Sequence, residues 1–497
     1  MKEKIYNAVN NILFDKKLYI YIIIVIAYFG IFCHMQFAPD TYAVLSSDAK
    51  GITTHLCSCG RFVTGVFIYI FKAKIPIAND RLYYISYGIA MTFMVLSMYK
   101  LDRIINKEVK NRLGVIVTIT SVTIINVFSL EMFLYIEKGI MALGIFMCIL
   151  ALEQLIRLFK GKKSGLFLGL VFMFVSNCCY QGNVGMFIAI AIVFTMKYSS
   201  SVKKFFINNV FMGIMYVIPA LANYLLIKFL FVNSRVKGEV IIAESIKKVI
   251  EGTQKMLFTN YGLLPKGLFV TVIGIIIAFS IYKTIVSKAS FKRKSFIIFT
   301  NVYLIVGTIL VTIVPQFLQD TSSIWFVARS SYPMGCLVGT LLLNIYLYCN
   351  DSIRIPGKLI TISIVSCLML IQFVNFNRFS LDNYIGNYVD METSLIIKEM
   401  VDEYEKNTGK KVCKVAIYAD SATQFAYPKV KVSGDINIKA YSTGWSTISI
   451  LRHYIGKYLV DVESDKEIEQ YFAEKNWTSF SEEQIIIKDN TLHICLY

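Results

Sequence analysis

"GLFLGLVFMFVSNCCYQGNVGMFIAIAIVFTM", residues 165–196, is a stretch of 32 residues without a single charged side chain. One continuous helix of this length would extend about 48 Å, whereas the apolar core of a bilayer is about 30 Å thick. Two complete spans would need more residues than the stretch contains. It therefore predicts two short helices joined by a turn at "SNCCYQGN" (176–183), where Gly182 and the asparagines favour a turn.

The polar turn within this stretch has two interpretations. Polar backbone at membrane depth is tolerated only where protein shields it or where it lines a water-filled cavity. In the first interpretation Asn177, Tyr180 and Gln181 line such a cavity. In the second, they form an ordinary polar loop at the membrane surface. The sequence leaves both open.

The whole chain has the composition of a multi-pass membrane protein. Of its 497 residues, 56% are hydrophobic and only 17% are charged, which differs from the balance of soluble domains. We predict an α-helical polytopic membrane protein with about eleven transmembrane segments. The predicted segments are 18–36, 82–99, 113–129, 139–155, 165–178, 184–196, 207–230, 267–282, 296–314, 334–349 and 359–375.

The net charge of +18 lies in the membrane part of the chain, because residues 375–497 hold 14 basic against 18 acidic side chains. Basic residues gather in the connectors between predicted spans, at 100–112, 157–163, 197–204, 283–295 and 350–358. This distribution follows the positive-inside rule and does not indicate a nucleic-acid partner. We expect a protein of the cell membrane whose N-terminus and basic connectors are cytoplasmic.

After the last predicted span the composition becomes that of a soluble domain. We predict a membrane domain at 1–376 and a small extracytoplasmic α/β domain at 377–497. Four patterns support the second domain: helices at 390–409 and 446–459, a strand at 411–420, and a terminal hairpin at 483–497. Gly409 suits the end of the first helix, and Asp489-Asn490 suits the hairpin turn.

Ionisable residues favour chemistry at the outer face over transport through the bundle. Transporters keep charged groups near the bilayer midplane, whereas Lys228 and Glu153 lie near the ends of their spans, where snorkelling explains them. The predicted outer loops hold most candidates for chemistry: Asp40, Tyr42, Asp48, Arg61, Glu131, Glu137, Tyr180, Gln181 and Arg329. A carboxylate there suits a general base, and arginines suit a phosphate.

Four passages together resemble the GtrII-type glucosyltransferases. They are "PDTYAVLSSDAKGITTHLCSCGRF" (39–62), "SLEMFLYIEKGIMALGI" (129–145), "SNCCYQGNVGMFIAIA" (176–191) and "WFVARSSYPMGCLVGTLLL" (325–343). No single motif is specific, but their order and spacing run through nearly the whole membrane part. The small soluble domain after the last span is also similar to that family.

The resemblance implies a membrane-embedded GT-C glycosyltransferase. Such an enzyme moves a sugar, typically glucose, from a polyprenyl-phosphate carrier in the membrane lipid to an extracytoplasmic cell-surface glycan. It implies that Asp40 is the catalytic base and that Glu131 is a second catalytic acid. Arg61 and Arg329 match the positions expected to meet the donor phosphate.

The chain departs from that family at the base, because members often carry two adjacent acids where Asp40 is followed by Thr41. Asp48 is therefore a second candidate for the base. The other loop residues, Tyr42, Glu137, Tyr180 and Gln181, are expected to bind substrate. The loop allows a divalent metal ion between carboxylates and phosphate, but no ligand spacing demands one, so no cofactor is expected with certainty.

Other lipid-carrier or polysaccharide machinery is the alternative. A flippase should line its bundle with charges, and this chain has few there. A polymerase or ligase would use a large outer loop with paired arginine and histidine, whereas the predicted loop 231–266 holds one arginine, Arg235, and no histidine. A sensor would need a cytoplasmic output module, and only short connectors are expected inside.

Overall fold

The computed structural model divides into two compact units. It describes residues 15–109, 113–231, 241–287, 290–348, 355–419, 436–438, 440–442, 444–475, 477 and 480–496. The first unit comprises Met1–Cys33, Ala49–Phe133 and Glu137–Asn377. The second comprises His34–Asp48, Leu134–Ile136 and Arg378–Tyr497. Arg235 lies outside the described residues.

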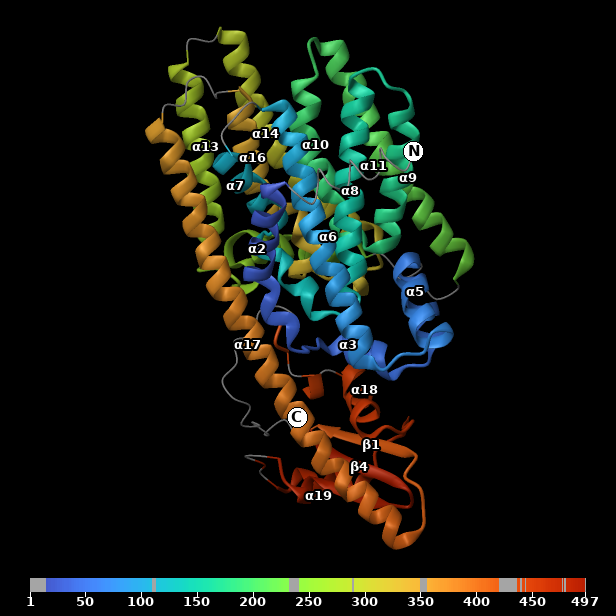
Figure 1. The fold of residues 1–497 in the computed structure, drawn as a ribbon. Helices are drawn as coiled ribbons and strands as arrows, with labels where there is room; N and C mark the ends of the chain where they lie inside the picture. The colour runs from blue at the N-terminus through green and yellow to red at the C-terminus, as the bar shows by residue number, and fades with distance from the viewer. Residues whose placement is uncertain are drawn as a thin grey trace. The chain divides into compact units, whose positions relative to one another are not determined.

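The first unit is built from helices, the longer of which run alongside one another (Figure 1). Its helices are α2 (Lys16–Phe29), α4 (Ala49–Ser58), α5 (Phe62–Tyr69), α6 (Asn79–Glu108), α7 (Leu113–Ile124), α8 (Lys138–Phe159), α9 (Ser164–Cys179), α10 (Gly185–Lys197), α11 (Val202–Leu230), α12 (Ile242–Gln254), α13 (Leu268–Val286), α14 (Phe291–Ile313), α15 (Tyr332–Gly335), α16 (Leu337–Tyr348) and the first part of α17 (Ile355–Thr408).

Short helical turns connect these helices. They are η1 (Gly30–Cys33), η2 (Ile70–Lys74), η3 (Val127–Ser129), η4 (Glu131–Leu134), η5 (Gln181–Asn183), η6 (Lys255–Thr259), η7 (Asn260–Gly262), η8 (Val314–Leu318), η9 (Thr321–Ser323) and η10 (Ala328–Ser331). Several of them carry the polar residues discussed below.

The helices confirm a multi-pass membrane protein. In the described part of the chain, seven helices are long and apolar enough to cross a membrane, or eight if the bent pair Gly114–Ile124 and Val127–Leu134 forms one span. Each of the eleven predicted segments coincides with a helix. Three of these helices, α9, α10 and α16, are apolar but shorter than the roughly 20 residues of a full span.

The uncharged stretch 165–196 forms two short helices, as predicted, with the turn at η5. Helix α9 packs against α8 and α11, while α10 packs against α14 and α8. The side chains of Asn177 and Tyr180 are buried in the unit. Protein therefore shields the polar turn.

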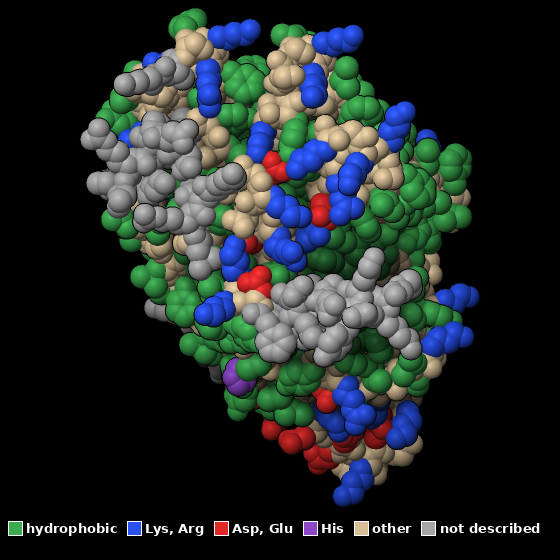
Figure 2. Space-filling view, turned by 45° about the horizontal axis from the view of Figure 1, so that its top comes forward, with side chains coloured by type: hydrophobic (Ala, Val, Ile, Leu, Met, Phe, Trp, Pro, Cys, Tyr) green, Lys and Arg blue, Asp and Glu red, His purple; other side chains and the backbone are tan. Residues whose placement is uncertain are grey.

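Basic side chains gather where α6, α8 and α10 end. The Glu108 carboxylate accepts hydrogen bonds from Lys160 at 2.7 Å and from Lys197 at 2.6 Å, so these three helix ends meet. Figure 2 shows lysines and arginines spread over this end of the first unit, with few acidic side chains among them. The other end of α8 begins at Lys138, about 33 Å away along a helix of 22 residues.

Two regions differ from the sequence prediction. The predicted loop 231–266 contains α12, whose buried residues Ser245, Val249 and Gly252 recur at helical spacing. The last span and the helix predicted at 390–409 are one helix, α17, of 54 residues. No proline interrupts the sequence between them, and the single Gly386 is tolerated inside a helix. Helix α17 ends before Gly409, which has a φ of 71° as a C-cap glycine should.

The second unit contains a four-stranded sheet of order β2-β1-β4-β3. Strands β1 and β4 are parallel, and β3 and β4 form the predicted hairpin, whose turn residues Asp489 and Asn490 both have positive φ. Residues from β1, α19 and β4 form a core in this unit. Its elements are α3 (Pro39–Ser46), the end of α17, β1 (Lys414–Ala419), η12 (Ala440–Ser442), α18 (Gly444–Ile455), β2 (Val460–Asp461), α19 (Lys466–Ala473), η13 (Glu482–Gln484), β3 (Ile485–Lys488) and β4 (Thr491–Leu496).

Candidate functional site

Glu131 and Arg329 form a buried ion pair in the first unit, although 198 residues separate them in the chain. The backbone N–H of Arg329 donates to Glu131 Oε2 at 2.7 Å, and its guanidinium Nη1 donates to Oε1. Glu131 is only 1% exposed. Because both carboxylate oxygens accept from Arg329, one from its backbone and one from its guanidinium, the residue is fixed in one place.

Arg61 belongs to the same buried cluster through Tyr180 and Glu137. Its guanidinium carbon lies 5.0 Å from the centre of the Tyr180 ring, and its Nη1 lies 3.3 Å from Glu137 Oε1. Tyr180 also feels the charge of Arg329 and is hydrogen-bonded to it. The phenol therefore links the two arginines, each of which has its own carboxylate.

The environment keeps the arginines charged and the phenol neutral. Burial alone would lower the pKa of the Arg61 guanidinium, but Tyr180 and Glu137 raise that pKa above its ordinary value. Burial raises the pKa of the Tyr180 hydroxyl, although Arg329 and Arg61 oppose this effect. Tyr180 therefore stays protonated at neutral pH and can donate a hydrogen bond.

Local backbone geometry places Arg61 and Gln181 in the cluster. Gly60 ends the helical turn after α4 with a φ of 78°, a conformation that other L residues rarely adopt. A Cβ on Gly60 would lie only 2.4 Å from the amide nitrogen of Gln181 and 2.5 Å from Asn223 Oδ1. Gln181 Nε2 donates to the Cys59 carbonyl at 2.9 Å, and Asn223 Nδ2 donates to the Gly60 carbonyl at 2.9 Å.

Lys138 has a buried side chain that the sequence prediction missed. It is 1% exposed, and its Nζ lies 3.5 Å from the centre of the Tyr83 ring. Among the described residues nothing accepts a hydrogen bond from this ammonium group. Its position directly after Glu137 was the available signal, but a lysine at the start of a span is usually explained by snorkelling.

The cluster brings two guanidinium groups together. Arg329 is paired with Glu131 and Arg61 with Glu137, and 17% of the Arg61 side chain stays exposed. Planar guanidinium groups match phosphate oxygens and form strong charge-assisted hydrogen bonds with them. The arrangement therefore suits a phosphate group.

The predicted first-loop residues Asp40, Tyr42 and Asp48 all belong to the second unit. Asp40 lies in the first turn of α3, where the helix dipole favours a carboxylate, and Asp48 lies after the end of that helix. Tyr42 is fully buried. Asp40 and Ala43, three residues apart, are less buried than the residues between them, so Asp40 lies on the more open side of α3.

Helix α3 packs against α18 of the C-terminal part of the chain. The hydroxyl oxygens of Tyr42 and Tyr454 are 3.4 Å apart, and the Tyr42 ring makes an edge contact with His453 at 5.7 Å between centres. The Asn387 side chain bonds both the N–H and the carbonyl of Phe37, at 2.8 and 3.0 Å. No sequence pattern indicated that the tail holds this loop.

Within the described ranges no group of three or more His, Cys, Asp or Glu side chains is placed to hold a metal ion. The carboxylates of Glu131 and Glu137 are instead paired with Arg329 and Arg61. No step of the chemistry below is assigned to a metal.

Comparisons with known proteins give limited information on this chain. No model of a known protein family matches it, and no curated protein matches its sequence. Among solved structures it is similar to the arabinofuranosyltransferase AftD from Mycobacteria, determined by cryo-electron microscopy, with a TM-score of 0.44 and 8% sequence identity. The similarity covers 90% of this chain but only 31% of that structure, so the chain spans about a third of its length.

Proposed function

We propose that this protein is a membrane glycosyltransferase that moves a sugar from a polyprenyl-phosphate carrier to an extracytoplasmic cell-surface glycan. The sugar is proposed to be a hexose, namely glucose, as the resemblance to GtrII-type enzymes implies. The observation that carries the proposal is the cluster in which Tyr180 lies beside the guanidinium groups of both Arg61 and Arg329. A carrier phosphate would accept charge-assisted hydrogen bonds from these two arginines.

The position of the cluster within the first unit suits a lipid-linked donor. Lys138 starts α8, whereas the basic connectors gather where α8 ends. If the basic end is cytoplasmic, as the positive-inside rule requires, the cluster lies toward the outer face. The phosphate of a carrier embedded in the outer leaflet would then meet it while the lipid chain stays in the apolar region.

The proposed roles divide between binding and proton transfer. Arg61 and Arg329 bind the donor phosphate and stabilise its charge as it leaves. Glu131 positions Arg329, since both of its carboxylate oxygens accept hydrogen bonds from that residue. Glu137 positions Arg61 in the same way through one oxygen. Tyr180 and Gln181 hold the two arginine segments together and face the sugar-phosphate.

In the proposed reaction the Asp40 carboxylate accepts the proton of the acceptor hydroxyl. The hydroxyl oxygen attacks the anomeric carbon, and the bond between that carbon and the phosphate oxygen breaks. The products are the glycosylated acceptor and the polyprenyl phosphate, whose new charge the arginines neutralise. Asp48 is the alternative base, and Tyr42 supports the helix that carries Asp40.

The test is sugar transfer by the purified chain in liposomes. Liposomes would contain polyprenyl-phosphate glucose with a labelled sugar, and a glycan acceptor would be added outside. The proposal predicts label on the acceptor and release of polyprenyl phosphate in equal amounts. Transbilayer movement of the carrier without transfer would indicate a flippase instead. Growth of the acceptor by preformed oligosaccharides, without transfer of single sugars, would indicate a polymerase or ligase.

A further inference from the structure

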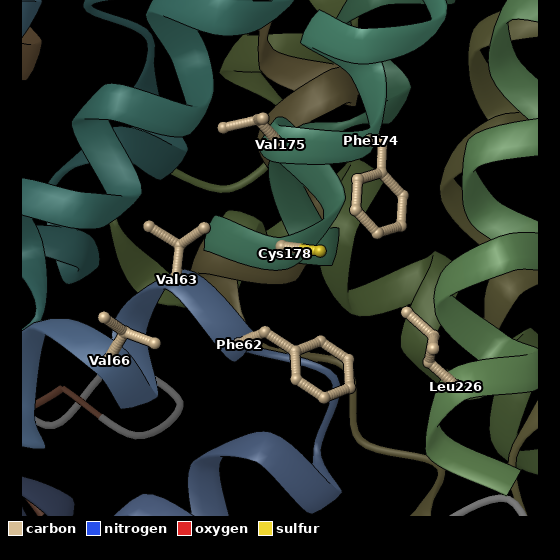
Figure 3. A pocket seen from close by; sticks show the side chains of 7 residues that line it. All are labelled: Phe62, Val63, Val66, Phe174, Val175, Cys178 and Leu226. Atoms are coloured by element: carbon tan, nitrogen blue, oxygen red, sulfur yellow. The ribbon is translucent and has the colours of Figure 1, made fainter. Parts of the chain in front are cut away.

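A cavity of about 390 Å³ lies between α5, α9 and α11 of the first unit. Its lining comprises Phe62, Val63, Val66, Phe174, Val175, Cys178 and Leu226, which are all apolar (Figure 3). On α5 and on α9 the lining residues follow the spacing i, i+1 and i+4, so each helix presents one face to the cavity. The volume lies within the range of small-molecule sites.

The cavity adjoins the arginine cluster along two chain segments. Phe62 directly follows Arg61, and Cys178 lies two residues before Tyr180, whose ring contacts the Arg61 guanidinium. On the third side, Asn223 Nδ2 lies 3.4 Å from Cys178 Sγ and also donates to the Gly60 carbonyl. A ligand in the cavity would therefore have the cationic cluster beside it.

The helices that form the cavity also expose apolar side chains around it. Val66 on α5 is 56% exposed, Leu226 on α11 is 38% exposed, and Val171 on α9 is exposed as well. In a membrane protein such surfaces face lipid chains. The cavity is thus reached from an apolar surface, while the cluster beside it suits an anion.

We infer that this cavity binds the phosphate-proximal isoprene units of the polyprenyl carrier, while Arg61 binds its phosphate. This inference rests on the proposed function for the choice of ligand. An apolar lining joined to a guanidinium matches a molecule with an apolar chain and one anionic end. The cavity therefore binds the lipid portion of the donor, whereas other residues act on its sugar.

Two variants fill the cavity without removing any residue of the cluster. Val66→Trp and Leu226→Trp add bulk at partly exposed positions, so both chains are expected to fold. Val217→Trp is the matched control, because Val217 is 55% exposed on α11 and does not line the cavity. Each variant would be reconstituted in liposomes as the full chain.

The first measurement is the KM for donors of different chain length. Both cavity variants should raise the KM for a long-chain polyprenyl-phosphate sugar by on the order of tenfold. The KM for a donor with a single isoprene unit should change much less, and Val217→Trp should change neither. Equal effects on both donors, or no effect on either, would overturn the inference.

The second measurement does not depend on sugar transfer. A polyprenyl phosphate without sugar, carrying a photoreactive group on its second isoprene unit, should label residues 62–66 or 174–178 of the wild type. Labelling should fall in Val66→Trp, and an excess of phospholipid should not compete with it. Labelling elsewhere, or equal competition by phospholipid, would overturn the inference. Specific labelling without any sugar transfer would uphold it and contradict the proposed function.

Discussion

Arg329 contacts both carboxylate oxygens of Glu131, one through its backbone N–H and the other through its guanidinium group. The double contact holds η10 against η4. Removing one partner would leave a buried charge without its counter-ion, which costs about 3–5 kcal/mol.

Glu131 and Arg329 should therefore show strong energetic coupling. We expect Glu131→Gln and Arg329→Met each to lower the free energy of unfolding of the purified full chain by about 3 kcal/mol. The double variant should lose less than the sum of the two, because it buries no single charge. Thermal unfolding in detergent would measure the coupling. Simple additivity of the two losses would show that the pair is not a unit.

Arg61 should act through the shape of its guanidinium as well as through its charge. Arg61→Lys keeps a cation but loses the planar fork that matches phosphate oxygens. We expect it to lower kcat/KM for the lipid-linked donor by on the order of tenfold or more. Arg81→Lys, at an exposed position of α6, is the control and should behave as the wild type. An unchanged kcat/KM for Arg61→Lys would remove Arg61 from the donor site.

The choice between Asp40 and Asp48 as the base can be made with two isosteric variants. Asp40→Asn should lower the transfer rate by a factor of about 10²–10⁴, because the amide cannot accept the proton. Asp48→Asn should retain most of the activity. Both proteins should insert and unfold as the wild type does, since both positions are at least partly exposed. The reverse pattern of rates would assign the base to Asp48.

Tyr42 should hold α3 against α18. Tyr42→Ala removes a fully buried aromatic side chain, and such changes cost about 3–5 kcal/mol. We expect faster hydrogen exchange over residues 39–46 and 444–455 in this variant. Tyr42→Phe should exchange nearly as the wild type, because the Tyr42–Tyr454 hydroxyl contact is long, at 3.4 Å. Tyr471→Ala, at an exposed position of α19, is the control.

Transfer by Tyr42→Ala separates a supporting role from a direct one. If Tyr42 acts only by holding α3, Tyr42→Phe should keep the wild-type rate while Tyr42→Ala loses it. A large loss of rate in Tyr42→Phe without faster exchange would show that the hydroxyl itself contacts substrate.

The second unit should lose stability in mild acid through His493. Burial lowers the pKa of His493 below its ordinary value, and its Nδ1 lies 2.8 Å from the Tyr418 hydroxyl. The unfolded chain therefore binds a proton at a higher pH than the folded one. Stability contributed by the neutral imidazole is complete above about pH 6.5 and falls as the pH drops below that value.

Hydrogen exchange of β1 and β4 in the full chain, measured between pH 5 and pH 8 and corrected for intrinsic exchange, would detect this loss. His493→Gln should flatten the pH dependence of the opening free energy in these strands. A profile as steep as that of the wild type would assign the acid sensitivity to other groups.

Much of the fold followed from the sequence. Long apolar runs predict helices because every backbone polar group must be satisfied inside a membrane, and each predicted segment coincides with a helix. The two short helices at 165–196 followed from length and charge alone. In the tail, Gly409 and Asp489-Asn490 marked a helix end and a hairpin turn because few residues adopt positive φ readily.

The sequence indicated the candidate residues within their loops, but it did not predict which of them lie together. Glu131 with Arg329, and Arg61 with Glu137, meet only because several helices bring distant loops to one end of the first unit. Lys138 was missed because burial of a charge at the start of a span depends on its neighbours, such as Tyr83, which no local pattern reveals. The length of α17 was missed because a composition change does not by itself break a helix.

By itself, the sequence determined that this chain crosses a membrane several times, which loops are polar, and that a small α/β region follows. These properties depend on hydrophobicity and local conformational preference, which are encoded residue by residue. Only the tertiary structure decided which carboxylate holds which arginine, that the Lys138 side chain is buried, and that α3 packs on α18. Such pairings depend on contacts between residues up to several hundred positions apart, and no local pattern specifies them.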